Sequence, residues 1–332
     1  MKFKNPTFVV VALLAALATL AIPQAVQAQQ VWKAMAGAQS KDMGKQAIAF
    51  LPNELWIHAG DSITWTSASG DIHTVSFLIA GQALTDFTVG CPGYSPSGVI
   101  FNGSTCVTAP PLVAGQEFTV KFPVPGNYNL VCLVHTHMSG VVHVLAASAA
   151  LPHDQSFYDE QAAKQQQSLL TDTDPQKQNM SSMLAARVLS KNAVAAGIGE
   201  MASTAAGFQS LSVVRFLNGK IEIRAGETVE WTVLDPAMPH TITFGTEPAN
   251  PGPPSANVSA DADGALHATI SSSGDTVHSG ILIAAAQNQP GVPQSPPGGT
   301  VFRVTFTQPG TYDYKCALHD TLGMVGKVVV LP

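Results

Sequence analysis

The stretch YKCALHDTLGM at residues 314–324 decides the fold, because an earlier part of the chain carries a shorter version of it. Residues 132–138 read CLVHTHM, so the two stretches follow the patterns Cys-x2-His-x4-Met and Cys-x2-His-x2-Met. Each stretch follows a Pro-Gly-x-Tyr turn and precedes a valine-rich segment. A lone Cys-x2-His pair is common by chance, whereas two copies in the same setting indicate a repeated unit.

The two copies extend well upstream of these stretches. FLPNELWIHAGDSITWT at 50–66 aligns without a gap with FLNGKIEIRAGETVEWT at 216–232, and HTVSF at 73–77 matches HTITF at 240–244. In the longer pair, apolar residues alternate on both sides of an Ala-Gly-acid turn, which is the period-2 pattern of half-buried strands. The sequence therefore predicts two copies of one all-β unit.

Length and composition agree with two such units, at about 31–148 and 207–332. The chain has 332 residues, more than one small sandwich needs. Charged residues make up 11%, whereas 28 glycines and 23 prolines favour turn-rich β structure over long charged helices. The formal net charge of -6 gives no sign of the basic face that a nucleic-acid-binding protein would show.

Two segments depart from the repeat. Residues 149–206 separate the units, and their stretches 157–170 and 180–196 are rich in Ala, Gln, Leu and Lys. This composition predicts a connector of two short helices, with a disordered linker as the alternative. Residues 247–297 lie inside the second unit and are rich in Pro, Ser, Gly and Asn, which predicts long surface loops around a few short strands.

The first 28 residues resemble a secretory signal peptide in their pattern. Two lysines precede an apolar run from Phe8 to Ile22, and small residues lead to a cleavage site after Ala28. A retained membrane anchor is the alternative, but the run is short for a full span, and no later segment is long and apolar enough to cross a bilayer. We therefore expect a periplasmic or secreted protein with no integral membrane segment after cleavage.

The four cysteines divide into two pairs by their setting. An exported chain meets an oxidising compartment, in which idle thiols tend to pair. Cys91 and Cys106 flank a stretch of Gly, Pro and Ser, and their closeness in sequence predicts a disulfide that closes this loop. Cys132 and Cys316 are then left over, each in the same local setting, which argues against two stray thiols.

Each repeat combines one thiol, two imidazoles and one thioether. The cysteine, one histidine and the methionine come from the loop between the last two predicted strands, and His73 or His240 comes from a turn after an earlier strand. A Greek-key sandwich brings those two places together at one end. A thiolate, two imidazoles and a weak axial thioether form a soft, distorted site that suits copper.

These residues resemble the cupredoxin family. The second cysteine loop is similar to that of plastocyanin, and the shorter first loop is similar to that of amicyanin. The resemblance covers both repeats but not the connector or the 247–297 insertion, and it implies two tandem all-β Greek-key β-sandwich (cupredoxin) domains, each with a blue type 1 copper ion. By the same resemblance the copper ligands are His73, Cys132, His135 and Met138 in the first domain and His240, Cys316, His319 and Met324 in the second.

The resemblance also implies how electrons and partners reach the sites. The later histidine of each set, His135 or His319, is expected to be the solvent-side exit for the electron. The backbone N–H of Thr74 or Thr241 is expected to contact the cysteine sulfur, although asparagine is frequent at that position in the family. An apolar docking rim is expected from Leu133, Val134, Leu318 and Leu322.

Simpler interpretations compete with these sites. The cysteine of each loop is alternatively a buried apolar thiol, and the histidine after it a satisfied surface residue. In the first loop the extra His137 competes for the metal. Met238 lies two residues before His240, but Met324 is preferred as the axial ligand because it belongs to the cysteine loop. Five histidines lack partners at ligand spacing and are expected at the surface or in the core: His58, His143, His153, His267 and His278.

The predicted function is electron transfer, not enzymatic catalysis, by two copper ions that cycle between Cu(II) and Cu(I), with redox proteins as donor and acceptor. A copper-dependent oxidase or nitrite reductase shares the fold but needs further histidines, typically one beside the type 1 cysteine, where Val131 and Lys315 stand here. A copper storage or delivery protein usually carries Met-rich or His-rich runs, which this sequence lacks. Two sites make either a two-electron carrier or an internal relay.

Overall fold

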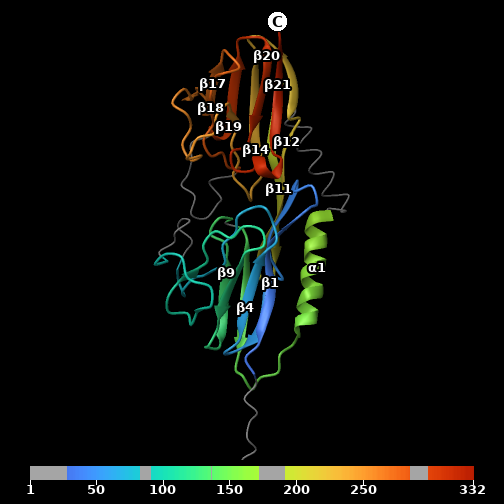
Figure 1. Cartoon of the computed structure of the whole chain (residues 1–332), viewed down its shortest axis with the longest axis vertical. Helices are drawn as coiled ribbons and strands as arrows, with labels where there is room; N and C mark the ends of the chain where they lie inside the picture. The colour runs from blue at the N-terminus through green and yellow to red at the C-terminus, as the bar shows by residue number, and fades with distance from the viewer. Residues whose placement is uncertain (1–27, 83–90, 136, 172–190, 285–297) are drawn as a thin grey trace, which may run out of the picture.

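The chain forms two β-rich units that follow one another along the long axis of the molecule, with a helix beside the first unit (Figure 1). The computed structural model describes residues 28–82, 91–135, 137–171, 191–284 and 298–332. The predicted signal peptide, apart from Ala28, therefore lies outside the described residues. So do residues 180–190 of the second predicted helix.

The first unit is a sandwich of two layers. One layer has the strand order β2-β1-β4-β8-β6 and the other the order β3-β10-β9-β5-β7. Parallel pairs join β1 to β4, β3 to β10 and β6 to β8 among otherwise antiparallel neighbours. The strands are β1 (Val31–Gln39), β2 (Lys45–Leu51), β3 (Glu54–His58), β4 (Ser62–Ser67), β5 (Ser76–Phe77), β6 (Val99–Ile100), β7 (Val107–Thr108), β8 (Glu117–Lys121), β9 (Gly126–Val131) and β10 (Ser139–Leu145).

The second unit repeats this arrangement. Its layers have the orders β16-β17-β19-β14-β11-β12 and β13-β21-β20-β15-β18. Each unit is thus a two-layer β sandwich, as the resemblance implied. The elements are β11 (Ala193–Thr204), β12 (Gly207–Leu217), β13 (Lys220–Arg224), β14 (Thr228–Leu234), β15 (Thr243–Phe244), β16 (Ser259–Ala260), β17 (Ala265–Ile270), β18 (Val277–His278), β19 (Gly298–Phe306), β20 (Gly310–Lys315), the 3₁₀ helix η2 (Asp320–Leu322) and β21 (Val325–Leu331).

The connector is helical only in part. Helix α1 (Gln155–Thr171) confirms the first predicted helix; it packs against β1 and β2, and its Tyr158 hydroxyl donates to the Trp56 carbonyl at 3.2 Å. The helix predicted over 180–196 is wrong at its end, because β11 begins at Ala193. Residues 193–196 are buried between β12 and β14, so burial in the sheet outweighs the helix preference of alanine.

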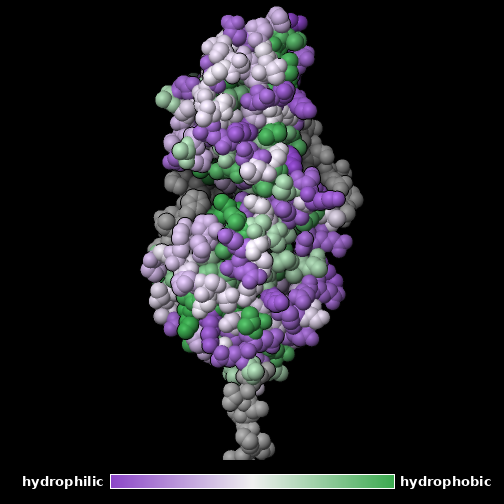
Figure 2. All heavy atoms as spheres, viewed as in Figure 1, coloured by the Kyte–Doolittle hydropathy of each residue, from purple (hydrophilic) through white to green (hydrophobic). Residues whose placement is uncertain are grey.

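The remaining fold predictions concern the core and the insertion. Trp65 and Trp231 are fully buried at equivalent positions of β4 and β14, which confirms that they pack the two cores. The described part of the 247–297 insertion contains short strands β16, β17 and β18 joined by loops, as predicted. On the face drawn in Figure 2, hydrophilic and hydrophobic residues are intermixed over both units. Among the described residues, no helix has the length and apolar character needed to span a bilayer.

The two units share one continuous sheet of 11 strands. The junction is an antiparallel ladder between β2 of the first unit and β12 of the second, in which residues 45–48 face residues 210–213. Each strand would otherwise be a sheet edge with unpaired backbone groups. The ladder therefore fixes the relative placement of the two sandwiches through backbone pairing.

Candidate metal centres

Both candidate sites are built on the loop between the last two strands of a unit. Cys132 follows β9 and Met138 precedes β10, and the loop is closed by the Cys132 N–H, which donates to the Met138 carbonyl at 3.0 Å. Cys316 and Met324 take the same places between β20 and β21, with a corresponding hydrogen bond of 3.1 Å. The longer second loop is accommodated by the single 3₁₀ turn η2, so both loops end with the methionine beside the cysteine.

The cysteine loop and the earlier histidine converge in each unit. Within the described part of the chain, two groups of His, Cys, Asp and Glu side chains come close enough to share a metal ion, with ligand atoms within 4.8 Å of one another. All six side chains are buried. The groups are His73, Cys132 and His135 in the first unit and His240, Cys316 and His319 in the second. We call His73 and His240 the inner histidines, and His135 and His319 the outer histidines.

A glycine makes room for each inner histidine. Register shifts interrupt β1 and β11 at Gly37 and Gly197, which have φ values of 73° and 75°. A Cβ atom at Gly37 would lie 2.2 Å from Nε2 of His73, and one at Gly197 would lie 2.2 Å from Nε2 of His240. The left-handed backbone and the close imidazole both require glycine here.

The donor atoms of both groups suit a metal ion. Nδ1 of His73 and Nδ1 of His240 are buried and have no hydrogen-bond partner among the described residues, which is costly unless something else binds them. Burial raises the pKa of the Cys132 and Cys316 thiols, but the two histidines beside each sulfur lower it by more. Both pKa values therefore lie well below the usual range. The thiolate is the form that binds metal.

The candidate axial ligands are the methionines at the ends of the two cysteine loops. Met138 and Met324 are fully buried beside their cysteines, and thioether, thiolate and imidazole together favour copper over hard cations. Met238, the alternative in the second unit, is buried as well, and its N–H donates to Asp235 Oδ1 at 3.1 Å. Ligation by Met138 and Met324 remains a proposal.

The threonine after each inner histidine ties the site to the cysteine loop. The N–H groups of Thr74 and Thr241 donate to the sulfurs of Cys132 and Cys316 at 3.4 and 3.3 Å, which confirms the predicted contact. The threonine hydroxyls add a bond that the sequence did not suggest. Their Oγ1 atoms accept from the next N–H of the loop, that of Leu133 at 2.7 Å and that of Ala317 at 2.8 Å.

The inner histidines have different partners in the two sites. Nε2 of His73 lies 2.8 Å from the Ser69 hydroxyl, whereas Nε2 of His240 lies 3.4 Å from Oδ2 of Asp235. Asp235 is fully buried, and its Oδ1 accepts from two backbone N–H groups and from the Ser212 hydroxyl. Burial lowers the pKa of His240, but Asp235 and Cys316 outweigh that effect and raise it to about 9.

The outer histidines face the same carboxylate. Nε2 of His135 lies 2.9 Å from Oδ2 of Asp71, and Nε2 of His319 lies 3.9 Å from Oδ1 of Asp71. Burial lowers the pKa of His135, but Asp71 and Cys132 raise it to about 10. Burial raises the pKa of the Asp71 carboxyl, and the surrounding histidines overcome this and hold the pKa below its usual range.

The predicted solvent-side exit is wrong for both outer histidines. His135 is 2% exposed and His319 is 3% exposed, because the two units cover each other's cysteine loops. The predicted apolar docking rim is wrong at Leu133 and Leu322 for the same reason, because both are buried. Val134 and Leu318 are half-buried. A repeat comparison treats each unit alone and carries no information about what covers its loop.

The remaining histidines have other partners. His137 is half-buried and packs edge-on against Phe208 of the second unit instead of joining the metal group. His58 and His278 are buried and bonded to backbone carbonyls. The others contact neighbouring side chains outside the two metal groups: His143, His153 and His267.

Sequence reasoning missed three residues around the imidazoles, namely Ser69, Asp71 and Asp235. Each stands two to five positions before an inner histidine, so a polar residue close upstream of a predicted ligand was the available signal. That spacing does not say which imidazole a side chain reaches. Asp71 contacts the outer histidines and not the inner one that follows it in sequence.

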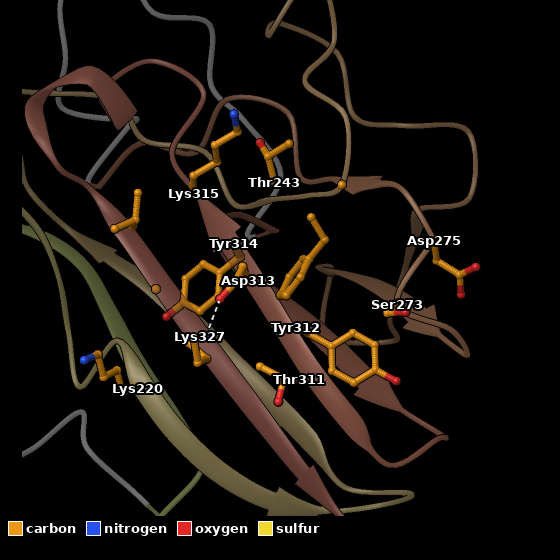
Figure 3. Close-up of a pocket in the computed structure, with 14 residues that line it drawn as sticks. Lys220, Thr243, Ser273, Asp275, Thr311, Tyr312, Asp313, Tyr314, Lys315 and Lys327 are labelled. Atoms are coloured by element: carbon orange, nitrogen blue, oxygen red, sulfur yellow. Dashed lines mark ion pairs between the residues drawn. The ribbon is translucent and has the colours of Figure 1, made fainter.

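The other two cysteines and a cavity of the second unit lie apart from the metal groups. Cys91 and Cys106 are joined by a disulfide with Cα atoms 5.0 Å apart, and Cys132 and Cys316 are free thiols. A cavity of about 540 Å³ lies on the sheet of the second unit, where Asp313 and Lys327 form an ion pair of 2.9 Å beside Tyr312 and Tyr314 (Figure 3). No histidine or cysteine lines it, so it is separate from the metal site.

The geometry defines a β-sandwich protein with a buried group of one cysteine and two histidines in each of two units. The family model of copper binding proteins, the plastocyanin/azurin family, matches residues 38–145 and 202–331. The chain therefore belongs to this family, and the match covers both units.

Individual relatives agree with the family assignment. The chain is 30% identical over 133 residues to amicyanin-alpha of Methylorubrum extorquens, covering 40% of this chain and 93% of that protein. It is also 30% identical over 99 residues to plastocyanin of Ginkgo biloba, covering 29% of this chain and 88% of that protein.

Solved structures of single cupredoxins are also similar. A mutant of amicyanin in the Cu(I) form has a TM-score of 0.24 and 19% identity, with 35% of this chain and 82% of that chain covered. A purple cupredoxin from Nitrosopumilus maritimus has a TM-score of 0.24 and 19% identity, with 34% of this chain and 99% of that chain covered. The family assignment rests on the sequence match and not on these scores.

Proposed function

We propose that this protein is an exported electron-transfer protein that holds one type 1 copper ion in each unit. The observation that carries the proposal is the recurrence, in two buried sites, of one low-pKa thiol and two imidazoles beside a buried methionine. His73, Cys132, His135 and Met138 would hold one ion, and His240, Cys316, His319 and Met324 the other. Copper bound to such a donor set supplies one-electron exchange between Cu(II) and Cu(I).

The surrounding residues support outer-sphere transfer by holding the donor atoms still. Thr74 and Thr241 donate to the cysteine sulfurs, and a buried side chain lies beside each of the four imidazoles. Such outer contacts set the orientation of each ligand before metal binds. The two cysteines are at most 1% exposed, so water is kept from their sulfurs. Little of the chain then needs to move when an electron arrives or leaves.

Export is supported by the N-terminal sequence and by the disulfide. The two lysines, the apolar run and the small residues before Ala28 form the three parts of a secretory signal. The disulfide between Cys91 and Cys106 suits an oxidising compartment. We propose a periplasmic or secreted location, with redox proteins as donor and acceptor.

The test is copper loading of the mature protein. We expect two copper ions per chain, an intense visible sulfur-to-copper band and a narrow-hyperfine EPR signal. Cys132→Ser and Cys316→Ser should each remove one ion and about half of the band, because each thiolate would bind its own ion. A colourless protein, or one with only a type 2 EPR signal, would contradict the proposal.

The competing functions make different predictions. A copper oxidase or nitrite reductase needs an open metal site, and the described residues contain no third group of His, Cys, Asp and Glu side chains beyond the two buried ones. Turnover of O2 or nitrite by the copper-loaded protein would favour the enzyme. A copper storage or delivery protein would instead release its metal readily to a weak chelator and lack the visible band.

A further inference from the structure

The two units are related by a local two-fold arrangement at their junction. Ala36 pairs with Phe50 in the first unit and Ala196 with Phe216 in the second, so the repeat alignment extends back through β2 and β12. At the same offset, Gln46 is equivalent to Ser212, and these two residues face each other in the β2–β12 ladder. An antiparallel ladder centred on equivalent positions turns equivalent surfaces toward each other.

Each cysteine loop is consequently linked to the opposite unit by hydrogen bonds at the junction. Arg215 of β12 donates to the Leu322 carbonyl in the second loop and to the Asp42 carbonyl of the first unit, both at 2.7 Å. At the first loop, the Ser139 hydroxyl accepts from the Phe208 N–H of the second unit at 2.9 Å. These bonds leave little freedom for the two loops to separate.

Asp71 lies where the two loops meet. Its two carboxylate oxygens face one outer histidine each, at 2.9 Å from Nε2 of His135 and 3.9 Å from Nε2 of His319. The other ring nitrogen of each histidine faces a cysteine sulfur, with Nδ1 of His135 3.8 Å from Cys132 and Nδ1 of His319 3.4 Å from Cys316. A continuous series of buried polar contacts therefore joins one sulfur to the other through both imidazoles and one carboxylate.

The series depends on a single side chain from one unit. In the second unit, the position two residues before the inner histidine is Met238, not an acid. Asp71 is 8% exposed, so little solvent separates its carboxylate from the two histidines that face it. Both histidines that face it belong to the metal groups, so its charge acts on both sites at short range.

We propose that Asp71 couples the two metal sites, so that an electron received at either site is exchanged within the chain through His135, Asp71 and His319. The inference rests on the proposed function. One electron leaves one site as the other gains it, no bond forms or breaks, and the first electron comes from an external redox protein. Asp71 acts as a positioning residue with a charge shared by two sites, which makes the chain an internal relay and not a pair of independent carriers.

The test separates the reach of Asp71 across the junction from its role in its own unit. The Cys132→Ser variant lacks the thiolate of the first site, so the visible band and its potential report the second site alone. Adding Asp71→Asn should raise the reduction potential of the second site, because a nearby negative charge stabilises the more positive Cu(II) state. Asp42→Asn is the control, since Asp42 is an exposed acid of the same junction that contacts Arg215 and no described histidine.

A second measurement follows the exchange itself. A pulse of a small reductant given to the full chain with both sites loaded should be followed by redistribution between the sites at a rate that does not depend on protein concentration. Asp71→Asn should slow this redistribution and raise both potentials, more at the first site than at the second, in the order of the two distances.

The outcomes separate the two proposals. If copper produces no visible band in either unit, the proposed function fails. If both bands form but Asp71→Asn leaves the second potential unchanged in the Cys132→Ser background, the coupling is overturned while the function stands. A redistribution rate that rises with protein concentration would also overturn it, because exchange would then occur between molecules.

Discussion

The two sites share their donor atoms but place a buried carboxylate behind different imidazoles. In the first site Asp71 contacts the outer histidine, and a hydroxyl, that of Ser69, contacts the inner one. In the second site Asp235 contacts the inner histidine, and the outer one lies 3.9 Å from Asp71. A carboxylate behind a ligating imidazole orients it and raises its basicity. The candidate ligands of the two sites are thus alike, while the residues around them make two copies of one motif unequal.

The largest effect is expected where the two sites are alike, at the glycines beside the inner histidines. Gly37→Ala and Gly197→Ala each place a Cβ atom 2.2 Å from an imidazole nitrogen, which must then move. Copper content should fall from two ions to one in each variant, with loss of the band of that unit alone. Metal analysis and visible absorption measure this loss.

Gly226→Ala is the matched control for the glycine variants. Gly226 has a φ of 91°, but nothing lies within 4 Å of the position of its Cβ. The variant should lose about 1–2 kcal/mol of unfolding free energy from the left-handed backbone and keep both ions. Equal loss of copper from Gly226→Ala would show that backbone strain, and not contact with histidine, explains the effect.

Unequal effects are expected at the partners of the inner histidines. Asp235→Asn removes a buried charge that accepts from several donors, and it should lower the unfolding free energy of the metal-free protein by roughly 2–3 kcal/mol. Ser69→Ala removes one hydroxyl contact and should cost about 1 kcal/mol. Denaturant unfolding compares the two variants. Costs of equal size would mean that the carboxylate adds nothing beyond a hydrogen bond.

The same two variants sharpen the comparison of the metal-loaded sites. Loss of the Asp235 charge should raise the potential of the second site, whereas loss of the neutral Ser69 hydroxyl should change the first potential less. Redox titration followed at the visible band measures the reduction potentials of both variants. A larger shift from Ser69→Ala would contradict the assignment of charge as the distinguishing feature.

Much of each site could be predicted from the sequence because its ligands are local. Cys316, His319 and Met324 lie within one loop, and the repeat supplied the earlier histidine of each group. The burial of the outer histidines could not be predicted, because their surroundings depend on which strands of the two units pair. Nothing in residues 45–48 or 210–213 alone says that β2 meets β12, and the placement of Asp71 between the sites follows from that pairing.

The prediction of a second helix in the connector was wrong at its end for a related reason. Alanine-rich residues near 193–196 have the composition of a helix, but small side chains also suit a strand that is buried on both faces. The first predicted helix was correct because α1 lies outside the sandwich, where the local helix preference of its residues is not overridden by strand pairing.

A smaller effect is expected at the junction, where the loops differ in their support. Arg215→Ala removes the bonds to the Leu322 and Asp42 carbonyls and should cost roughly 1–2 kcal/mol. The EPR hyperfine pattern of the second site should change while that of the first stays constant, since the arginine contacts the second loop. Arg224→Ala, which loses a bond to the exposed C-terminal residue, is the control and should alter neither signal.

The smallest difference between the sites is expected at the threonines that contact the sulfurs. Thr74→Val and Thr241→Val keep the backbone N–H that donates to sulfur but remove the hydroxyl, which accepts from the loop and makes a longer contact of 3.8 Å to the same sulfur. The two hydroxyl bonds have nearly equal lengths of 2.7 and 2.8 Å, so each variant should lose a similar unfolding free energy of about 1 kcal/mol. Both copper bands should persist, because the ligands and the N–H contact remain. If one valine variant lost its band and the other did not, the difference between the sites would extend to the sulfur itself, and the carboxylates alone would not account for it.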